Sequence, residues 1–239
     1  MSKLQIAHAV VFAALAFTAG AAELTTTEVA GTKGDGPDGK ANTEDDTWGF
    51  WFELAHAPGT FRRLTTHSTS VPEKGIPGKV TGPVASLLPN PGSTKGWIVH
   101  RDWDGRFEGI WGDENTGAVL AHPYVEKGAH LAVAITYTIP ENGVYVVSGS
   151  LTDLQVKPDF PKHDGVLWRL EVIDGAAGKT VELAKGGPIG DGHGRPDSAE
   201  FRSRKTALAK GHVVRLTIHP NKWWGQDLTR IDSLRIEKQ

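Results

Sequence analysis

Apolar and polar residues alternate in short segments along most of the chain, and this pattern predicts an all-β protein. In the segment 47–54, Trp48, Phe50, Phe52 and Leu54 share one parity and would line one face of a strand. Residues 131–139 show the same period of two, and the segments 144–151, 166–173, 180–184, 213–219 and 231–237 are also predicted to be short strands. Many short strands at this spacing predict an antiparallel β-sandwich or barrel.

Turn residues between these segments predict how the strands connect. Asn142 and Gly143 accept the positive φ of a tight reversal, so residues 131–151 are expected to form a hairpin. Residues 180–184 are the expected partner of the strand 166–173. The prolines and glycines between Val71 and Gly96 are too dense for a helix or a central strand and predict a long surface loop.

A helix is predicted at one place only, with a strand as the alternative. Residues 198–210 have Asp197 or Ser198 as the N-cap and Gly211 as the stop, with Phe201 and Leu208 seven residues apart. A strand that ends near residue 210 is the other interpretation of this segment.

The first residues are typical of an export signal. A basic start, an apolar run over 4–17 and small residues at 19–22 predict a signal peptide, residues 1–21, cleaved after Ala21 or Ala22. The run is shorter than the ~20 residues that span a bilayer, so we expect no membrane span and a secreted or periplasmic protein. Residues 22–46 are predicted to be an acidic, Gly- and Thr-rich linker, with a calcium loop within it as the alternative, and residues 47–239 a β-sandwich domain.

Composition narrows the classes of function. The 239 residues include no cysteine, which excludes disulfides, thiolate metal sites and cysteine nucleophiles. There are 26 Lys and Arg against 28 Asp and Glu, a formal net charge of −2. Nucleic acid and anionic membrane surfaces are therefore not expected partners.

Four phrases in the second half of the chain resemble a known family when they are taken in order. They are residues 137–145 (YTIPENGVY), 163–168 (HDGVLW), 210–220 (KGHVVRLTIHP) and 227–232 (DLTRID). Over residues 115–239 the chain resembles the galactose-binding-like jelly-roll carbohydrate-binding modules of secreted bacterial proteins. The resemblance implies a jelly roll that binds an extracellular polysaccharide through loops at one end, often with a structural calcium ion.

In similar modules an acidic residue near the start of the last strand helps to hold that calcium. Carried onto this chain, the role falls on Asp227 and Asp232. Taken from the residues alone, Asp227 is equally a turn cap and Asp232 an edge charge.

Tryptophans in polar turns are the predicted sugar contacts, because sugars stack on flat aromatic rings. Trp168 is excluded, since it lies mid-strand among apolar residues and is expected in the core. The two adjacent tryptophans at 223 and 224 stand in a loop between two strands, where at least one is expected at the surface. The candidate ligand-binding residues are Trp103, Trp111, Asp191, His193, Trp223 and Trp224. A solvated loop at 186–197 and a protein contact at the aromatic patch are the alternatives.

Catalysis is the alternative function. The histidines do not fall in metal-binding spacings, and no Gly-x-Ser-x-Gly elbow occurs. A jelly-roll polysaccharide lyase would use His122 with Tyr124, or His100 with Arg101, and a glycoside hydrolase would use two carboxylates from separate strands. A non-catalytic cell-surface structural protein is the third hypothesis.

Overall fold

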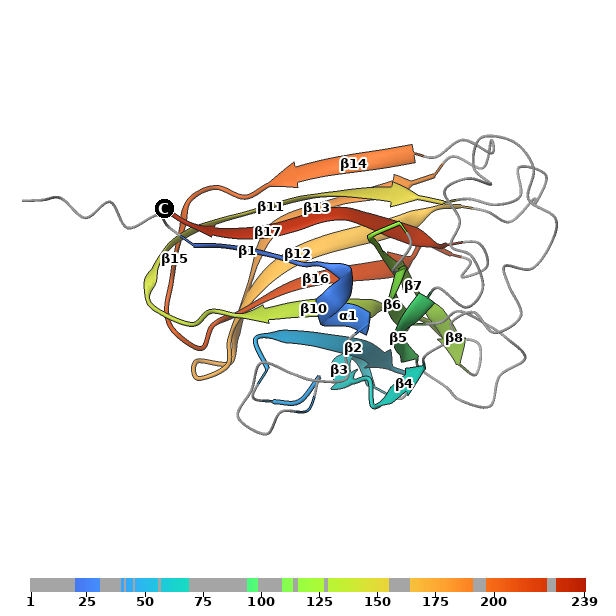
Figure 1. Ribbon diagram of the computed structural model, residues 1–239, viewed down its shortest axis with the longest axis horizontal. Coiled ribbons are helices and arrows are strands. Elements are labelled where there is room, and N and C mark those ends of the chain that lie inside the picture. Colours follow the sequence, from blue (N-terminus) through green and yellow to red (C-terminus); the bar gives the residue numbers. More distant parts are fainter. Residues whose placement is uncertain are drawn as a thin grey trace, which may run out of the picture.

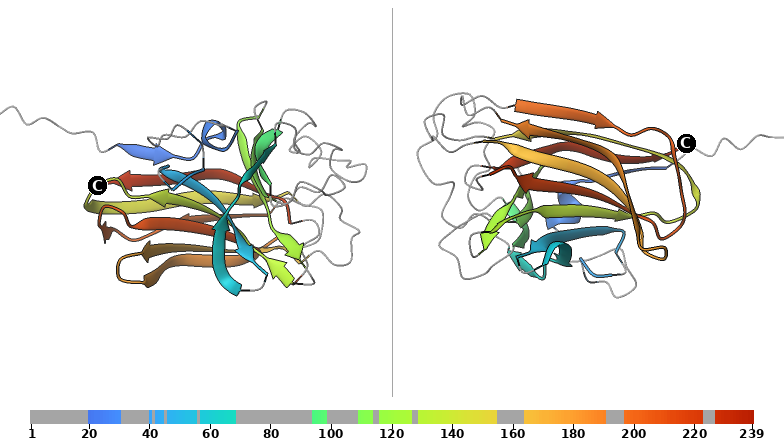
Figure 2. Two further views of the ribbon diagram at one scale, coloured as in Figure 1. Left: turned by 90° about the horizontal axis from the view of Figure 1, so that it is seen from below. Right: turned by 180° about the vertical axis from the view of Figure 1, so that it is seen from behind.

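The computed structural model confirms the all-β prediction: two antiparallel sheets pack face to face as a sandwich (Figures 1 and 2). It describes residues 20–30, 40, 42–44, 46–55, 57–68, 94–98, 109–113, 116–126, 129–154, 164–190, 197–222 and 227–239. In this part of the chain the only α-helix is the five-residue α1 (Thr26–Ala30). No helix there is long and apolar enough to cross a membrane.

Nine of the strands in the described residues form the larger sheet. They are β1 (Ala21–Glu23), β4 (Thr66–Ser68), β5 (Thr94–Ile98), β6 (Gly109–Asp113), β7 (Ala118–His122), β11 (Gly143–Asp153), β14 (Asp197–Arg202), β15 (Thr206–Leu208) and β17 (Thr229–Lys238). Their order is β14-β11-β17-β7-β6-β5-β4, with β1 beside β17 and β15 beside β11.

The smaller sheet has six strands among the described residues. They are β2 (Trp48–Leu54), β3 (Ala57–Arg63), β10 (Val133–Thr138), β12 (Val166–Asp174), β13 (Lys179–Ile189) and β16 (Val213–Pro220). Their order is β13-β12-β16-β10-β2-β3. Two further strands, β8 (Tyr124–Glu126) and β9 (Ala129–Leu131), pair only with each other.

Alternation along the strands builds the core between the sheets. On β16, Val214, Leu216 and Ile218 are buried among the apolar residues that fill the sandwich. At the edge where β13 meets β14, the rings of Trp168 and Phe201 lie 5.0 Å apart between centroids. The prediction that Trp168 belongs to the core is confirmed. The residues that alternate with the core residues along β12 and β16 form the outer face of the smaller sheet.

The predicted hairpin over residues 131–151 is wrong. Both strands exist, but β10 lies in the smaller sheet and β11 in the larger one, so the turn between them carries the chain across the sandwich. Ile139 still donates its N–H to the carbonyl of His212 at 2.8 Å, which continues the pairing of β10 with β16. Turn residues predict that the chain reverses, but they do not determine which strand each arm pairs with.

Two other segments differ from their sequence interpretation. Residues 198–208 form β14 and β15 rather than a helix, because both strands pair with β11. The predicted linker is partly integrated into the sandwich: β1 pairs with β17, and Leu24 and Val29 are buried. Most of the predicted loop over 71–96 lies outside the described residues, and its last residues belong to β5.

Candidate ligand-binding site

Several of the predicted site residues lie outside the described part of the chain. These are His100, Arg101, Trp103, Asp191, His193, Trp223 and Trp224. Their roles stay predictions.

Trp111, in contrast, is placed by the structure and is not a surface residue. It lies in β6 with its side chain 0 % exposed. An indole ring that is sealed in the interior cannot stack against a glycan at the surface, so we remove Trp111 from the candidate ligand contacts.

His122 is also interior. It is 6 % exposed and its Nδ1 lies 2.6 Å from the carbonyl oxygen of Pro123. Burial lowers the pKa of His122 to about 4, so the imidazole is neutral at pH 7. It does not line the pocket described below. Tyr124 begins the short strand β8.

The two aspartates that were predicted to share a metal ion differ in burial and in their partners. Asp232 is exposed; its carboxylate accepts a hydrogen bond from Thr152 Oγ1 at 2.6 Å and pairs with Arg230. Asp227 is 0 % exposed, and neither of its carboxylate oxygens has a hydrogen-bond partner among the described residues. Burial, and then repulsion by Asp153 and Asp164, raises the pKa of Asp227 to about 10.

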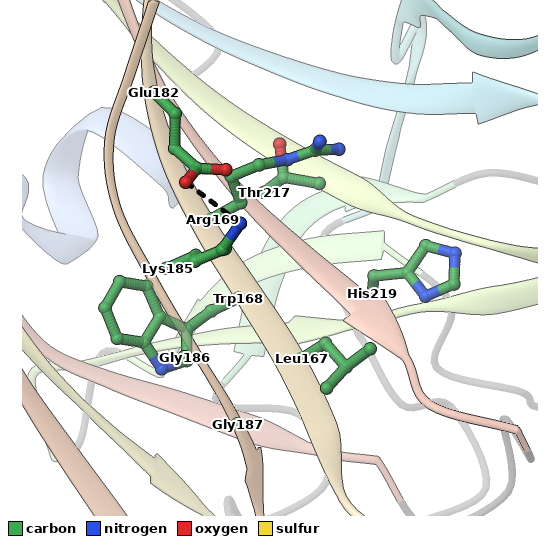
Figure 3. A pocket seen from close by; sticks show the side chains of 9 residues that line it. All are labelled: Leu167, Trp168, Arg169, Glu182, Lys185, Gly186, Gly187, Thr217 and His219. Carbon is green, nitrogen blue, oxygen red and sulfur yellow. Dashed lines mark ion pairs between the residues drawn. The ribbon is translucent and has the colours of Figure 1, made fainter.

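A partly open pocket of about 630 Å³ lies on the outer face of the smaller sheet (Figure 3). This is within the size range of small-molecule sites. It is lined by Leu167, Trp168, Arg169, Glu182, Lys185, Gly186, Gly187, Thr217 and His219.

Strand register brings these residues together. Leu167 pairs with His219 and Arg169 with Thr217 across β12 and β16, so four outward positions form one patch. The neighbouring strand β13 adds Gly186, where a Cβ would come within 2.7 Å of the Trp168 ring. A glycine is needed at this position because the indole ring already fills the space that a side chain would take.

Polar groups without partners lie at the pocket. Thr217 is only 3 % exposed, and its Oγ1 has no hydrogen-bond partner within the described ranges. Nε1 of Trp168 also has no hydrogen-bond partner in those ranges. Thr136, on the adjacent strand β10, is also buried, but its Oγ1 accepts a hydrogen bond from Trp51 Nε1 at 2.8 Å. Because a buried polar group is costly without a partner, the Thr217 hydroxyl is the group that a ligand would satisfy.

Charged side chains surround the pocket. Lys185 Nζ lies 3.1 Å from Glu182 Oε1, the ion pair drawn in Figure 3, and Arg169 Nε lies 3.4 Å from Glu171 Oε1. Nδ1 of His219 contacts the carbonyl oxygen of Pro220. A carbonyl oxygen only accepts hydrogen bonds, so Nδ1 of His219 is the donor in this contact.

Two arginines on the rest of this face contact aromatic rings. Arg215 donates to Glu171 Oε2 from Nη2 at 2.8 Å, and its guanidinium lies 4.5 Å from the centroid of the Phe61 ring. Arg63 lies at the same distance from the Trp51 ring. These contacts hold β3 against the sheet, although Nε of Arg63 has no hydrogen-bond partner among the described residues.

No protein-family model matches the sequence, and no curated protein sequence matches it. Solved structures match the chain only distantly. TmCBM61 in complex with beta-1,4-galactotriose is 14% identical, with a TM-score of 0.33, over 51% of this chain and 70% of that one. The Eiger TNF from S. frugiperda is 13% identical, with a TM-score of 0.31, over 50% of this chain and 69% of that one. The K3 cleaved adhesin domain of Lys-gingipain from Porphyromonas gingivalis is 10% identical, with a TM-score of 0.36, over 63% of this chain and 82% of that one. All three TM-scores are below 0.5, so these structures support no statement about the fold or the ligand of this chain.

The sequence did not predict this pocket, because the candidate ligand contacts were residues of loops and turns, whereas the pocket is formed by residues of strands. Arg169 and Thr217 alternate with core residues, which is the signal that both face outward, but only the strand register shows that they are neighbours. Gly186 and Gly187 were interpreted as the start of a loop, whereas they belong to β13.

Proposed function

We propose that this protein binds a carbohydrate without modifying it, in the pocket on the outer face of the smaller sheet. The observation that carries the proposal is the buried hydroxyl of Thr217, which has no hydrogen-bond partner among the described residues and lies in a partly open pocket bordered by charged side chains. The protein is further proposed to be exported, on the basis of the signal-like residues 1–21.

The chemistry of the lining suits a polyhydroxylated ligand. Arg169 and Lys185 donate hydrogen bonds, Glu182 accepts them, and the Thr217 hydroxyl does both. Leu167 adds an apolar wall. A sugar has hydroxyls that donate and accept around a ring with apolar C–H faces, so it matches both parts of this lining.

The described lining lacks the pair of carboxyl groups that glycoside hydrolysis uses. Glycoside hydrolysis uses two carboxyl groups on either side of the bond, and the lining contains only Glu182, which is paired with Lys185. Proton abstraction by a lyase would need an accessible base; the predicted His122 is buried, so within the described lining only His219 could take that role.

A panel of soluble oligosaccharides and polysaccharides, neutral and acidic, tests the proposal by isothermal titration calorimetry. We expect at least one member to bind wild-type protein, and Thr217→Val to raise its Kd by about 2- to 10-fold through the loss of one hydrogen bond. Arg169→Ala should raise Kd as well. Arg202→Ala is the matched control: it removes an exposed, ion-paired arginine from the larger sheet and should leave Kd unchanged.

Two results would overturn the proposal. One is the absence of binding across the panel at millimolar sugar. The other is binding that Trp223→Ala or Trp224→Ala abolishes while Thr217→Val and Arg169→Ala leave it intact, which would place the site in the predicted loop instead.

A further inference from the structure

The charged side chains at the pocket do not balance one another. The carboxylate of Glu171 is shared by two arginines: Arg215 Nη2 lies 2.8 Å from its Oε2, and Arg169 Nε lies 3.4 Å from its Oε1. Lys185 and Glu182 form a separate pair at 3.1 Å, so their two charges cancel. These five side chains carry three positive charges and two negative ones, which leaves one positive charge in excess.

The excess charge lies on Arg169. Arg215 makes the shorter contacts with Glu171, from Nε at 3.2 Å and Nη2 at 2.8 Å, and its side chain is only 15 % exposed. Arg169 reaches Glu171 through Nε alone, and its side chain lines the pocket and is 50 % exposed. Within the described part of the chain, Nη1 and Nη2 of Arg169 have no hydrogen-bond or ion-pair partner. Both nitrogens therefore keep their donors for a ligand.

Strand register places Arg169 between two further donors. It pairs with Thr217 of β16 on one side and with Lys185 of β13 on the other, and all three residues line the pocket (Figure 3). The Cβ atoms of residues directly opposite each other on antiparallel strands are about 4.5–5.5 Å apart. An anionic group that binds the Arg169 guanidinium would therefore lie close to a hydroxyl donor and a second cation.

We propose that the ligand of this pocket is an acidic carbohydrate, whose carboxylate or sulfate group binds Nη1 and Nη2 of Arg169. The inference rests on the proposed function, because it names the class of sugar that the same pocket takes. A guanidinium donates two parallel hydrogen bonds to the two oxygens of such a group, whereas a sugar hydroxyl offers a single oxygen. One anionic group on the sugar also cancels the excess positive charge, which a neutral sugar leaves uncompensated.

Calorimetric titration of the full-length protein with matched forms of each oligosaccharide tests the inference. The forms are the uronate, its methyl ester, and the neutral sugar with and without a sulfate group on the same carbon. We expect the uronate or the sulfated sugar to bind about 10-fold more tightly than its uncharged counterpart, and high salt to narrow the difference. The form with the lower Kd shows whether a carboxylate or a sulfate is the natural anionic group.

Variants of the lining assign the preference to individual residues. Arg169→Gln should make the Kd values of the charged and uncharged forms equal, and Arg169→Lys, which keeps the charge without the fork, should retain about a 3-fold preference. Glu182→Gln removes the carboxylate of the lining and releases Lys185, so it should lower the Kd of the charged form about 2- to 5-fold and leave that of the uncharged form unchanged. Arg202→Gln, on the larger sheet, is the matched control and should keep the wild-type preference.

The outcomes separate this inference from the proposed function. If the methyl ester and the unsulfated sugar bind as tightly as the charged forms, and Thr217→Val weakens all of them, the inference is overturned and carbohydrate binding in the pocket stands. A preference for the charged form that Arg169→Gln leaves intact also overturns the inference. If no form of any oligosaccharide binds, the proposed function and this inference are both overturned.

Discussion

Replacing Thr217 by valine separates the effect of this hydroxyl on the stability of the free protein from its effect on ligand binding. Valine keeps the branched shape and exchanges the hydroxyl for a methyl group. Because Oγ1 is buried without a partner in the described residues, the substitution removes an unsatisfied polar group that costs about 1–3 kcal/mol. We expect Thr217→Val to raise the free energy of unfolding by about 1 kcal/mol and Tm by about 2–4 °C, while it weakens carbohydrate binding.

The same substitution at Thr136 is the internal control. There the hydroxyl accepts the Trp51 Nε1 hydrogen bond, so Thr136→Val leaves the indole N–H unpaired and should cost about 1–2 kcal/mol. Urea denaturation followed by tryptophan fluorescence, without ligand, measures both variants. If Thr217→Val loses as much stability as Thr136→Val, the Thr217 hydroxyl is already satisfied in the free protein and the reasoning fails.

Three further predictions concern the scaffold. Glu171→Gln should lower the free energy of unfolding, measured in urea, by about 3 kcal/mol, because it leaves the Arg215 charge unpaired. If the double variant with Arg215→Met loses the sum of the two single losses, the two residues are not coupled and the prediction is contradicted. Gly96→Ala should lower the free energy of unfolding by about 3 kcal/mol in the same assay, because its Cβ would lie 2.4 Å from backbone atoms of β6. As the control, a Cβ at Gly175 meets nothing within 4 Å, so Gly175→Ala should change the free energy of unfolding by under about 0.5 kcal/mol. The pKa of His122 falls from 6.5 to about 4 on folding, so acid protonates the unfolded chain before the folded one. The free energy of unfolding should therefore drop by about 3 kcal/mol as the pH falls from 6.5 to 4. If His122→Leu leaves this pH dependence of stability unchanged, the prediction is refuted.

The pattern of the sequence was sufficient to predict strands but not their partners. The segments of β2, β12, β16 and β17 were all predicted, because a period of two is a local property of each strand. The crossing between β10 and β11 was not, since the turn at residues 139–142 suits a hairpin and a crossing equally. Strand pairing depends on contacts between distant segments, which no local pattern contains.

The candidate sites depend even more on these distant contacts. Trp111 was predicted as a ligand contact because, with Trp103, it flanks the polar residues 104–106, yet pairing with β5 and β7 buries it. Asp227 was predicted as a site residue from its position before the last strand, but its burial beside the end of β11 follows from the register of β11 and β17.

The most direct test of carbohydrate binding on the sheet face is chemical-shift mapping with the tightest ligand of the panel on isotope-labelled protein. The account predicts that the amide signals of Leu167, Arg169, Gly186 and Thr217 shift together and saturate at the calorimetric Kd. Shifts confined to the larger sheet, with these four signals unmoved at saturating ligand, would contradict it.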